Sequence, residues 1–349
     1  MKVSILTHSS YGETGGINKY VDQVVRCVSQ NSLVNEINIF AKLNSKKISQ
    51  KTNIFVSRNF LFFTILFNLR KLISSDIILI THLNLIPYLV FFIIFNKKII
   101  LFSYGLEVWG QKKNFFYKYL INKINFFICM REYTKKELIK KYKLQNKKYY
   151  LLHNFIDEIT KYKKIKKSNI ILTIARLDSK EKFKGIDETL EAISLIKKKK
   201  FKYYILGDGD DKNRLIKKSK NLNIKNTVKF FGHVSHKKKI ELLKKAKILS
   251  MPGSDATFDT YPYRFSFLEA ANYSLNILGS VPFKSEKRLT DKYKIFTFVN
   301  PENRFEIKRN ILKLLKKRNL FSNDIHKDFS KLKFCSNLNN ILLEVHFTD

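Results

Sequence analysis

The sequence predicts an α/β protein made of two Rossmann-like domains, each a doubly wound parallel sheet, that face each other across a cleft. Short runs rich in Ile, Val and Phe alternate with longer Lys-studded stretches of helical period, which is typical of parallel sheets covered by helices on both faces. The alternation stops in a polar, charged stretch after Asp157 and then starts again. At 349 residues the chain is too long for one ordinary core but suits two.

The first domain is expected over residues 1–157. Its strands are expected at 2–8, 36–42, 76–81, 98–104, 126–130 and 149–155, and its helices at 17–31, 86–96, 115–125 and 133–143. Residues 77–96 carry no Lys, Arg, Asp or Glu over about the length that spans a bilayer. Because His82, Asn84 and Pro87 interrupt this run, we expect a strand, a loop and a helix there in preference to a membrane span.

A linker is expected over residues 158–168 and the second domain over 169–330. Its strands are expected at 169–176, 202–209, 227–232, 246–253 and 276–280, and its helices at 186–199, 211–221, 236–246, 265–274 and from about 302. Residues 331–349 are expected to form a helical segment that packs back on the first domain. Doubly wound sheets bind ligands at the carboxyl ends of their strands, so the loops that follow the strands are the expected site.

The charge of the chain limits its partners to anions. Its 67 Lys and Arg residues outnumber 29 Asp and Glu, giving a formal net charge of +38 that attracts nucleic acid, an anionic membrane or phosphorylated substrates. The excess is nearly all Lys and comes with abundant Asn, Ile and Phe, a composition that AT-rich coding also produces. Charge alone therefore does not choose among these partners.

The cysteines and the N-terminus favour a reducing, cytoplasmic compartment. Cys27, Cys129 and Cys335 lie far apart without CxxC or Cys/His spacing, so neither a disulfide framework nor a zinc site is expected. The N-terminal MKVSILTHSS has one Lys and only a short apolar run, and it continues into a glycine-rich loop. We expect no signal peptide.

Three strand-end loops carry candidate binding residues, two of them suited to a phosphate. Gly15-Gly16 precedes a helix and lets the backbone approach a bound group, although an ordinary turn also explains the pair. Arg176 and Lys184 place two cations in one loop of the second domain, as a leaving diphosphate requires, although solvated surface cations are the alternative. Gly207-Asp208-Gly209 resembles a DxD metal motif, but we interpret it as a turn.

Seven segments carry a resemblance to a known family. They are GGINKYV, YLLHNFID, IARLDSKEKFKGIDETLEAI, YYILGDGDD, TVKFFGHV, ILSMPG and FLEAANYSLNIL. In order and spacing they resemble retaining glycosyltransferases of the GT-B fold, specifically the large family 4 type, or glycosyl transferases group 1. The resemblance covers nearly the whole chain and is clearest from Leu151 to Gly279.

The resemblance implies a nucleoside diphosphate sugar bound mainly by the second domain and an acceptor bound mainly by the first. Arg176 and Lys184 would hold the donor diphosphate, Glu269 the ribose hydroxyls, and the backbone near Gly232 would lie beside the base. The donor-binding residues are expected to be Gly15, Gly16, Gly232, His233, Val234, Tyr261, Arg264 and Glu269. Members of the family need no metal, so no cofactor is expected.

Two departures from the family pattern fall on the side of the donor sugar. The family has two glutamates separated by seven residues, and Tyr261 stands where the first would be. Asp255 or Asp259 replaces that acid only if the loop carries an insertion. Tyr104 occupies the place of a family His that contacts the donor sugar, and Glu107 follows it.

These departures shape the expected roles. We expect Arg176, Lys184 and Tyr104 to be catalytic, and His82 and Glu107 to lie on the acceptor side. His82 could supply the missing imidazole from the preceding strand end, and His8 is a comparable candidate. A lone His in a loop is more often structural.

Two stretches of the first domain mix aromatic residues with Lys at helical spacing. Residues 59–73 and 110–127 resemble helices lying on an anionic bilayer, although partly buried helices with a solvated Lys face explain them almost as well. We lean toward peripheral contact with the inner face of the cytoplasmic membrane and toward a lipid-linked glycan acceptor.

The expected function is transfer of a sugar, with retention, from a UDP- or GDP-sugar to a glycan or lipid-linked glycan in surface polysaccharide biosynthesis, such as O-antigen, capsule or lipopolysaccharide. The departing diphosphate can take the acceptor proton, so missing acids do not exclude catalysis. The alternative is a catalytically silent subunit that binds nucleotide or glycan. A nucleic-acid partner is not expected, because the Lys residues are spread over every helix.

Overall fold

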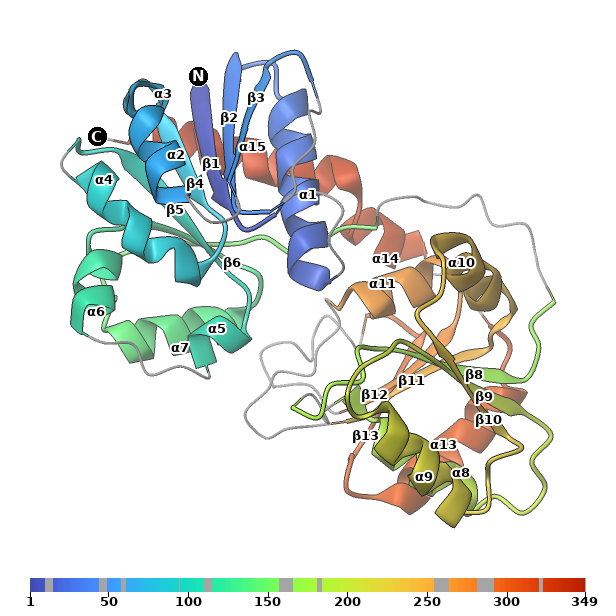
Figure 1. The fold of residues 1–349 in the computed structure, drawn as a ribbon. Coiled ribbons are helices and arrows are strands. Elements are labelled where there is room, and N and C mark those ends of the chain that lie inside the picture. Colours follow the sequence, from blue (N-terminus) through green and yellow to red (C-terminus); the bar gives the residue numbers. More distant parts are fainter. Residues whose placement is uncertain are drawn as a thin grey trace. The chain divides into compact units, whose positions relative to one another are not determined.

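The computed structural model describes two compact units, each built on a parallel sheet (Figure 1). The described residues are 1–9, 15–43, 49–57, 61–93, 95–109, 115–156, 166–180, 184–253, 264–280, 292–319 and 323–348. Unit 1 comprises Met1–Phe155 and Phe329–Asp349, and unit 2 comprises Ile156–Asp328. The predicted fold class, two doubly wound parallel-sheet domains, is confirmed. Each unit is described by itself below.

Unit 1 contains a seven-stranded parallel sheet in the order β3-β2-β1-β4-β5-β6-β7. The strands are β1 (Lys2–Thr7), β2 (Glu36–Ala41), β3 (Thr52–Val56), β4 (Ile77–Ile80), β5 (Lys98–Ser103), β6 (Phe126–Cys129) and β7 (Lys148–Leu151). The strand order reverses between β1 and β4. At such a switch point the loops that follow neighbouring strands turn to opposite faces of the sheet, which leaves room for a ligand.

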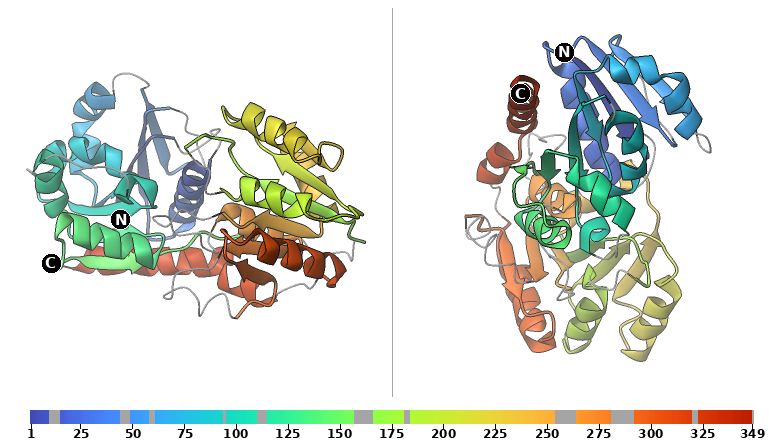
Figure 2. Two further views of the ribbon diagram at one scale, coloured as in Figure 1. Left: turned by 90° about the horizontal axis from the view of Figure 1, so that it is seen from below. Right: turned by 90° about the vertical axis from the view of Figure 1, so that its left-hand side faces the viewer.

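Helices cover both faces of this sheet (Figures 1 and 2). The helices of unit 1 are α1 (Gly16–Gln30), α2 (Leu61–Phe67), α3 (Leu69–Ile73), the 3-10 helix η1 (Leu83–Leu89), α4 (Val90–Ile93), α5 (Leu106–Trp109), α6 (Phe115–Asn122), α7 (Glu132–Tyr142) and α15 (Lys331–Phe347). Buried residues of α2, α3, η1, α6 and α7 share one hydrophobic core against the strands. Helices α1 and α15 pack against each other, with the Tyr20 and Phe334 rings 5.7 Å apart.

The C-terminal helix α15 is tied to unit 1 by covalent and polar contacts. Cys27 of α1 and Cys335 of α15 form a disulfide. The Lys98 ammonium donates to the carbonyl oxygen of His346 at 2.7 Å. The expectation of no disulfide is therefore wrong, because a pairing across 308 residues leaves no local spacing for the sequence to reveal.

The long uncharged run at residues 77–96 is divided among β4, η1 and α4. Each of these elements is short, and the side chains of β4 are buried in the sheet. Across the residues that the structure describes, no helix has both the length and the apolar character needed to cross a membrane.

Unit 2 contains a six-stranded parallel sheet in the order β10-β9-β8-β11-β12-β13. The strands are β8 (Ile170–Ile174), β9 (Lys202–Leu206), β10 (Val228–Gly232), β11 (Ile248–Met251), β12 (Asn276–Ser280) and β13 (Phe296–Val299). The helices are α8 (Ile186–Ser194), α9 (Lys212–Asn221), α10 (His236–Lys245), α11 (Phe265–Asn272), α13 (Arg304–Lys316) and α14 (Asn323–Asp328). Helices α8, α9 and α13 share a core on one face, and α10 and α11 lie on the other (Figure 1).

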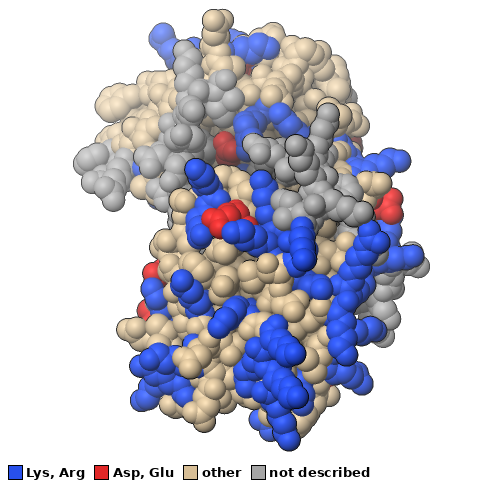
Figure 3. Space-filling view, turned by 90° about the vertical axis from the view of Figure 1, so that its right-hand side faces the viewer, with Lys and Arg blue, Asp and Glu red and all other residues tan. Residues whose placement is uncertain are grey.

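The cations of the chain are widely distributed over its surface. Figure 3 shows Lys and Arg side chains over much of one face, with few acids among them. In unit 2 several of these cations are paired within their own helix or with a neighbouring one; Lys238 and Lys245, for example, both contact Glu241 at 2.8 Å. On the face shown, the positive charge is therefore spread broadly and is not gathered in a single patch.

Candidate functional site

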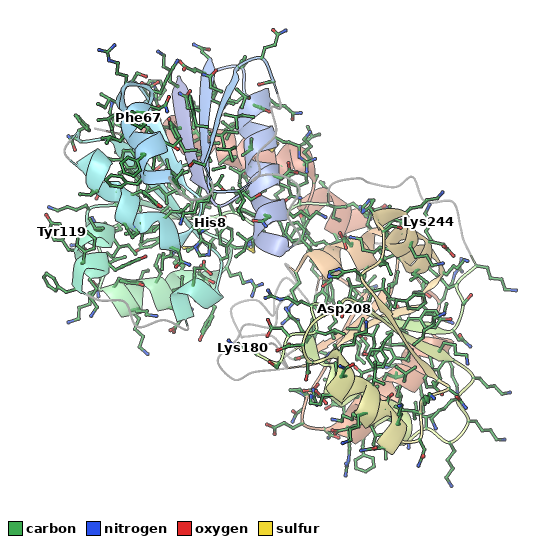
Figure 4. The ribbon with its side chains drawn as sticks, in the orientation of Figure 1. His8, Phe67, Tyr119, Lys180, Asp208 and Lys244 are labelled. Atoms are coloured by element: carbon green, nitrogen blue, oxygen red, sulfur yellow. A yellow bond between two sulfur atoms is a disulfide. The ribbon has the colours of Figure 1, made fainter. Side chains whose placement is uncertain are left out.

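The residues singled out in unit 2 lie at the carboxyl edge of its sheet. Because all six strands are parallel, the loops that follow them meet at the same edge. Arg176 follows β8, Asp208 follows β9 and His233 follows β10. In Figure 4, Lys180 and Asp208 mark the loops after β8 and β9.

The turn after β9 has a structural role that only glycine can fill. Gly207 and Gly209 have φ angles of 134° and 155°, and a Cβ at either position would collide with the carbonyl oxygen of Ala175 or Leu177. The Leu177 amide donates to the carbonyl oxygen of Asp208 at 2.9 Å. This close approach fixes the loop that carries Arg176.

The Asp208 side chain itself is held within this turn. Its carboxylate accepts hydrogen bonds from the Gly209 amide and the Lys212 ammonium, both at 3.0 Å. These bonds lower the pKa of Asp208, with Lys212 the larger influence. The contacts agree with the interpretation of Gly207-Asp208-Gly209 as a turn.

Lys184 and Gly185 stand at the start of helix α8. Gly185 is left-handed with φ 81°, and a Cβ there would collide with the backbone of Pro252 and Gly253 after β11. Arg176 and Lys184 line the same small depression, together with Asp178, Ile186 and Asp187. A helix N-terminus flanked by two cations favours an anion.

The acids beside this depression are paired with basic side chains. Asp187 accepts hydrogen bonds from Arg214 at 2.6 and 2.9 Å and from Lys218 at 2.6 Å. Burial raises the pKa of Asp187, but these hydrogen bonds outweigh it and hold the pKa below its usual value. The Arg176 guanidinium is 65% exposed and lies 3.7 Å from Asp178. Because Arg214 and Lys218 compensate the charge of Asp187, this acid opposes an incoming anion less than an unpaired acid would.

Glu188, in the first turn of α8, is a candidate that sequence reasoning missed. Burial raises the pKa of its carboxyl to about 7. Its Oε2 atom is buried without a hydrogen-bond partner among the residues that the structure describes. Three acids in α8, Asp187, Glu188 and Glu191, look alike in the sequence, so no local signal separates Glu188 from its two neighbours, which are paired with basic side chains.

Glu269 lies in α11, where it faces a cation of α10. Its Oε1 atom is 2.9 Å from the Lys239 ammonium, and the two side chains are only 20% and 23% exposed. Arg264 precedes α11 with its guanidinium 5.8 Å from the centre of the Phe267 ring. Tyr261 lies outside the described residues.

The end of β10 is shaped by Gly232, which adopts a left-handed φ of 66°. A Cβ at this position would lie 3.0 Å from the Asp208 carboxylate. His233 is exposed and Val234 is half-buried, and Ser235 then caps α10 by accepting a hydrogen bond from the Lys238 amide. The structure therefore places Gly232, His233 and Val234 in one strand-end loop beside Asp208.

In unit 1, three strand ends bring His8, His82 and Tyr104 together. They follow β1, β4 and β5, which are adjacent in the sheet. The His8 and His82 rings lie 5.2 Å apart, and the His82 and Tyr104 rings 6.3 Å apart. Burial, with the nearby His82 and Lys42 adding to it, lowers the pKa of His8 to about 4, so its imidazole is neutral at pH 7. Figure 4 shows His8 at this edge of the unit.

Tyr104 is almost fully buried, and its hydroxyl has no hydrogen-bond partner within the described part of the chain. The ring packs edge-on against Tyr20, with the ring centroids 5.5 Å apart. Burial raises the pKa of Tyr104 well above its usual value, so the hydroxyl stays protonated. A buried hydroxyl without a partner is costly in a folded protein unless a ligand completes its bonding.

Glu107 folds back onto the turn that carries Tyr104. Its carboxylate accepts hydrogen bonds from the Tyr104 amide at 2.5 Å and from the Gly105 amide at 3.1 and 3.2 Å. Burial raises the pKa of Glu107, and these backbone hydrogen bonds only partly offset it. The contacts give Glu107 a positioning role behind Tyr104.

Gly15 and Gly16 begin helix α1. Gly15 has φ 125°, which disfavours other residues, although a Cβ there would meet no atom of the described residues within 4 Å. The position therefore requires glycine for its backbone conformation. Among the described residues, the space beside it is open.

Comparisons with known proteins bear on the family and the fold of the chain. Residues 154–327 match the family model described as glycosyl transferases group 1. No curated protein sequence matches the chain.

Three solved structures illustrate the fold. The chain is similar to the lipopolysaccharide outer core galactosyltransferase WaaB in its apo form, with 15% identity, 99% of both chains covered and a TM-score of 0.69. It is similar to Alr3699/HepE of Anabaena in complex with UDP-glucose, with 12% identity, coverage of 99% and 100%, and a TM-score of 0.76. It is also similar to WaaG, a glycosyltransferase involved in lipopolysaccharide biosynthesis, with 13% identity, coverage of 99% and 96%, and a TM-score of 0.64. At these identities the likeness shows the fold.

Proposed function

We propose that this chain, which has the GT-B fold and whose residues 154–327 belong to glycosyl transferases group 1, transfers a sugar from a UDP- or GDP-sugar to a glycan. One observation carries the proposal. The carboxyl edge of unit 2 combines two cations at a helix N-terminus, Arg176 and Lys184, with a half-buried carboxylate, Glu269. The Anabaena relative, solved with UDP-glucose, supports a donor of this class.

Arg176 and Lys184 are proposed to bind the donor diphosphate. When the bond to the sugar breaks, negative charge develops on the leaving diphosphate, and fixed cations stabilise that charge best in the transition state. The N-terminus of α8 adds backbone amides from the same place. No side chain has to act as base, since a phosphate oxygen of the leaving group can accept the acceptor proton.

Glu269 is proposed to accept hydrogen bonds from the ribose hydroxyls. The Lys239 ammonium orients this carboxylate through their 2.9 Å contact. Gly232, His233 and Val234 are proposed to lie beside the base, and Tyr261 and Arg264 beside the transferred sugar.

Unit 1 is proposed to bind the acceptor and to contribute to binding of the donor sugar. The Tyr104 hydroxyl is proposed to replace the family His as a donor to the sugar, with Glu107 holding its turn. His82 is proposed on the acceptor side, next to the neutral His8. Gly15 and Gly16 are proposed to approach the phosphate and the sugar.

The finer points of the proposal concern stereochemistry, acceptor and location. Transfer is proposed to retain the anomeric configuration and to need no metal. The acceptor is proposed to be a lipid-linked glycan of a surface polysaccharide such as O-antigen, capsule or lipopolysaccharide. WaaB and WaaG, both named for lipopolysaccharide, support this choice. The chain is proposed to work in the cytoplasm, on the inner face of the membrane.

The test is a two-stage assay. Calorimetry with individual UDP- and GDP-sugars identifies the donor, and release of nucleoside diphosphate is then measured with a lipid-linked acceptor. We expect release that depends on the acceptor and falls in the Arg176→Ala variant.

Intact nucleotide binding without release would instead favour a catalytically silent subunit. That alternative rests on Tyr104 and Tyr261, which occupy the positions of the family His and Glu.

A further inference from the structure

One stretch of unit 1 is almost free of acids. Between residues 58 and 131 the sequence has ten Lys and Arg residues and two acids, Asp76 and Glu107. Glu107 is buried on backbone amides, and Asp76 accepts a hydrogen bond from the Lys2 amide. Both acids are therefore engaged by backbone amides. Lys71 of α3 is paired with Glu36 at 2.8 Å, which leaves Arg70 of α3 and Lys118 of α6 to carry positive charge in these helices.

Helices α2 and α6 expose large aromatic side chains. We call them the aromatic face: Phe62, Phe63 and Phe67 of α2 and Phe115, Phe116 and Tyr119 of α6. Phe67 is 83% exposed and Phe115 is 85% exposed, whereas a large apolar side chain is normally among the most buried in a folded protein. Contiguous exposed apolar surface usually marks an interaction site.

Both helices lie on the same side of the sheet of unit 1. Leu61 and Ile65 of α2, and Leu120 and Ile121 of α6, point inward into one shared core. The exposed aromatic residues belong to the same two helices, so they lie on the outer surface of that side. Figure 4 shows Phe67 on α2 and Tyr119 on α6 along this side of the unit.

Cations stand next to these rings in a manner suited to a membrane interface. The Lys123 ammonium lies 5.2 Å from the centre of the Tyr119 ring, and Arg70 follows α2 within α3. Aromatic rings enter the boundary between headgroups and acyl chains, while Lys stems extend along apolar surface toward anionic headgroups. A second copy of the chain would bring like charges together on this face.

We propose that the aromatic face docks on an anionic lipid bilayer as a peripheral membrane contact. The inference deepens the proposed function, because it names the surface that would keep unit 1 beside a lipid-linked acceptor. The contact does not depend on catalysis, so the two can be tested separately.

The experiment measures sedimentation of the full chain with vesicles at physiological salt. Vesicles of phosphatidylcholine alone are compared with vesicles that also contain phosphatidylglycerol. We compare the wild type, the Phe67→Ser/Phe115→Ser variant, the Lys118→Gln/Lys123→Gln variant and a matched control, Leu332→Ser/Phe347→Ser. The control removes two side chains of α15 that are 84% and 76% exposed. Thermal melting by circular dichroism checks that each variant folds.

We expect binding to the anionic vesicles only. It should fall about tenfold or more in the aromatic variant, since each ring contributes buried apolar area. It should fall about thirtyfold in the Lys variant, because each of the two cations near the surface contributes about 1 kcal/mol. The control should bind like the wild type.

Two results would overturn the proposal. One is equal vesicle binding by the aromatic variant and the wild type. The other is binding of a polyuridine RNA that depends on the same residues, which would make the face a nucleic-acid site. UDP affinity, measured on the same samples, separates failure of the docking surface from failure of the donor site.

Discussion

The Lys239 ammonium lies 2.9 Å from a carboxylate oxygen of Glu269, which joins α10 to α11 at the carboxyl edge of unit 2. Both side chains are mostly buried, so loss of either one takes a charged contact away from the other. The pair therefore acts as a unit, with Glu269 facing the proposed ribose and Lys239 behind it.

The first prediction concerns this pair. Glu269→Ala should weaken UDP binding about tenfold or more, because a charge-assisted hydrogen bond contributes about 1.5–3 kcal/mol. Lys239→Met should weaken it about threefold to tenfold by loosening the carboxylate. Calorimetry on both variants and on the double variant measures the coupling. Strictly additive losses would show that Lys239 does not act through Glu269.

A second prediction separates the phosphate contacts from the rest of the donor site. Arg176→Ala and Lys184→Ala should each lower the affinity for UDP by about tenfold, since each removes one charge-assisted contact. Affinity for uridine, which has no phosphate, should not change. Asp208→Asn provides a control on the same sheet edge, because its carboxylate is engaged by Gly209 and Lys212. If uridine binding also falls, the cations act on the fold rather than on the diphosphate.

The third prediction concerns the hydroxyl of Tyr104. Since it has no partner among the described residues, Tyr104→Phe should leave the melting temperature unchanged or raise it slightly. If the hydroxyl donates to the donor sugar, the variant should lower kcat about tenfold or more, the usual range for removing one transition-state donor. Tyr104→Ala, which also empties buried space, should lower both the activity and the melting temperature. Full activity of Tyr104→Phe would assign the residue to packing alone.

Two strands that sequence reasoning missed, β3 and β13, lie at the edges of the sheets. β3 and β13 are the outermost strands of their sheets, and several of their side chains are half-exposed. Central strands are buried on both faces and appear as continuous apolar runs, but an edge strand mixes polar and apolar residues and loses that signal. The alternation of central strands and helices was enough to predict the fold class.

The candidate site divides in the same way. Strand-end positions such as Arg176 and His82 were predictable, because parallel strands bring their carboxyl ends together. Lys239 was not, since Lys237 and Lys238 beside it look identical and only the packing of α10 near α11 selects one. The disulfide between Cys27 and Cys335 likewise depends on the return of α15 to α1.

The last prediction concerns the pH dependence of stability through Glu188. Burial raises the pKa of this carboxyl to about 7 in the folded chain, against an ordinary value of 4.5. The folded state therefore binds the proton more tightly than the unfolded state. The resulting stabilisation is fully present below about pH 4.5 and is lost as the pH rises through about 7. Glu188→Gln keeps the shape and removes the charge, so it should stabilise the fold above pH 7 by about 3 kcal/mol and at pH 5 by less than about 1 kcal/mol.

Thermal melting of the wild type and the variant between pH 5 and pH 8 measures this difference. The two curves should separate as the pH rises. Glu302→Gln is the matched control, because Glu302 is exposed and its loss removes the same charge from unit 2. Parallel curves for Glu188→Gln and the wild type would show that the carboxyl is not desolvated in the folded chain. A diverging Glu302→Gln curve would assign the effect to net charge, because this variant shares only that charge change with Glu188→Gln.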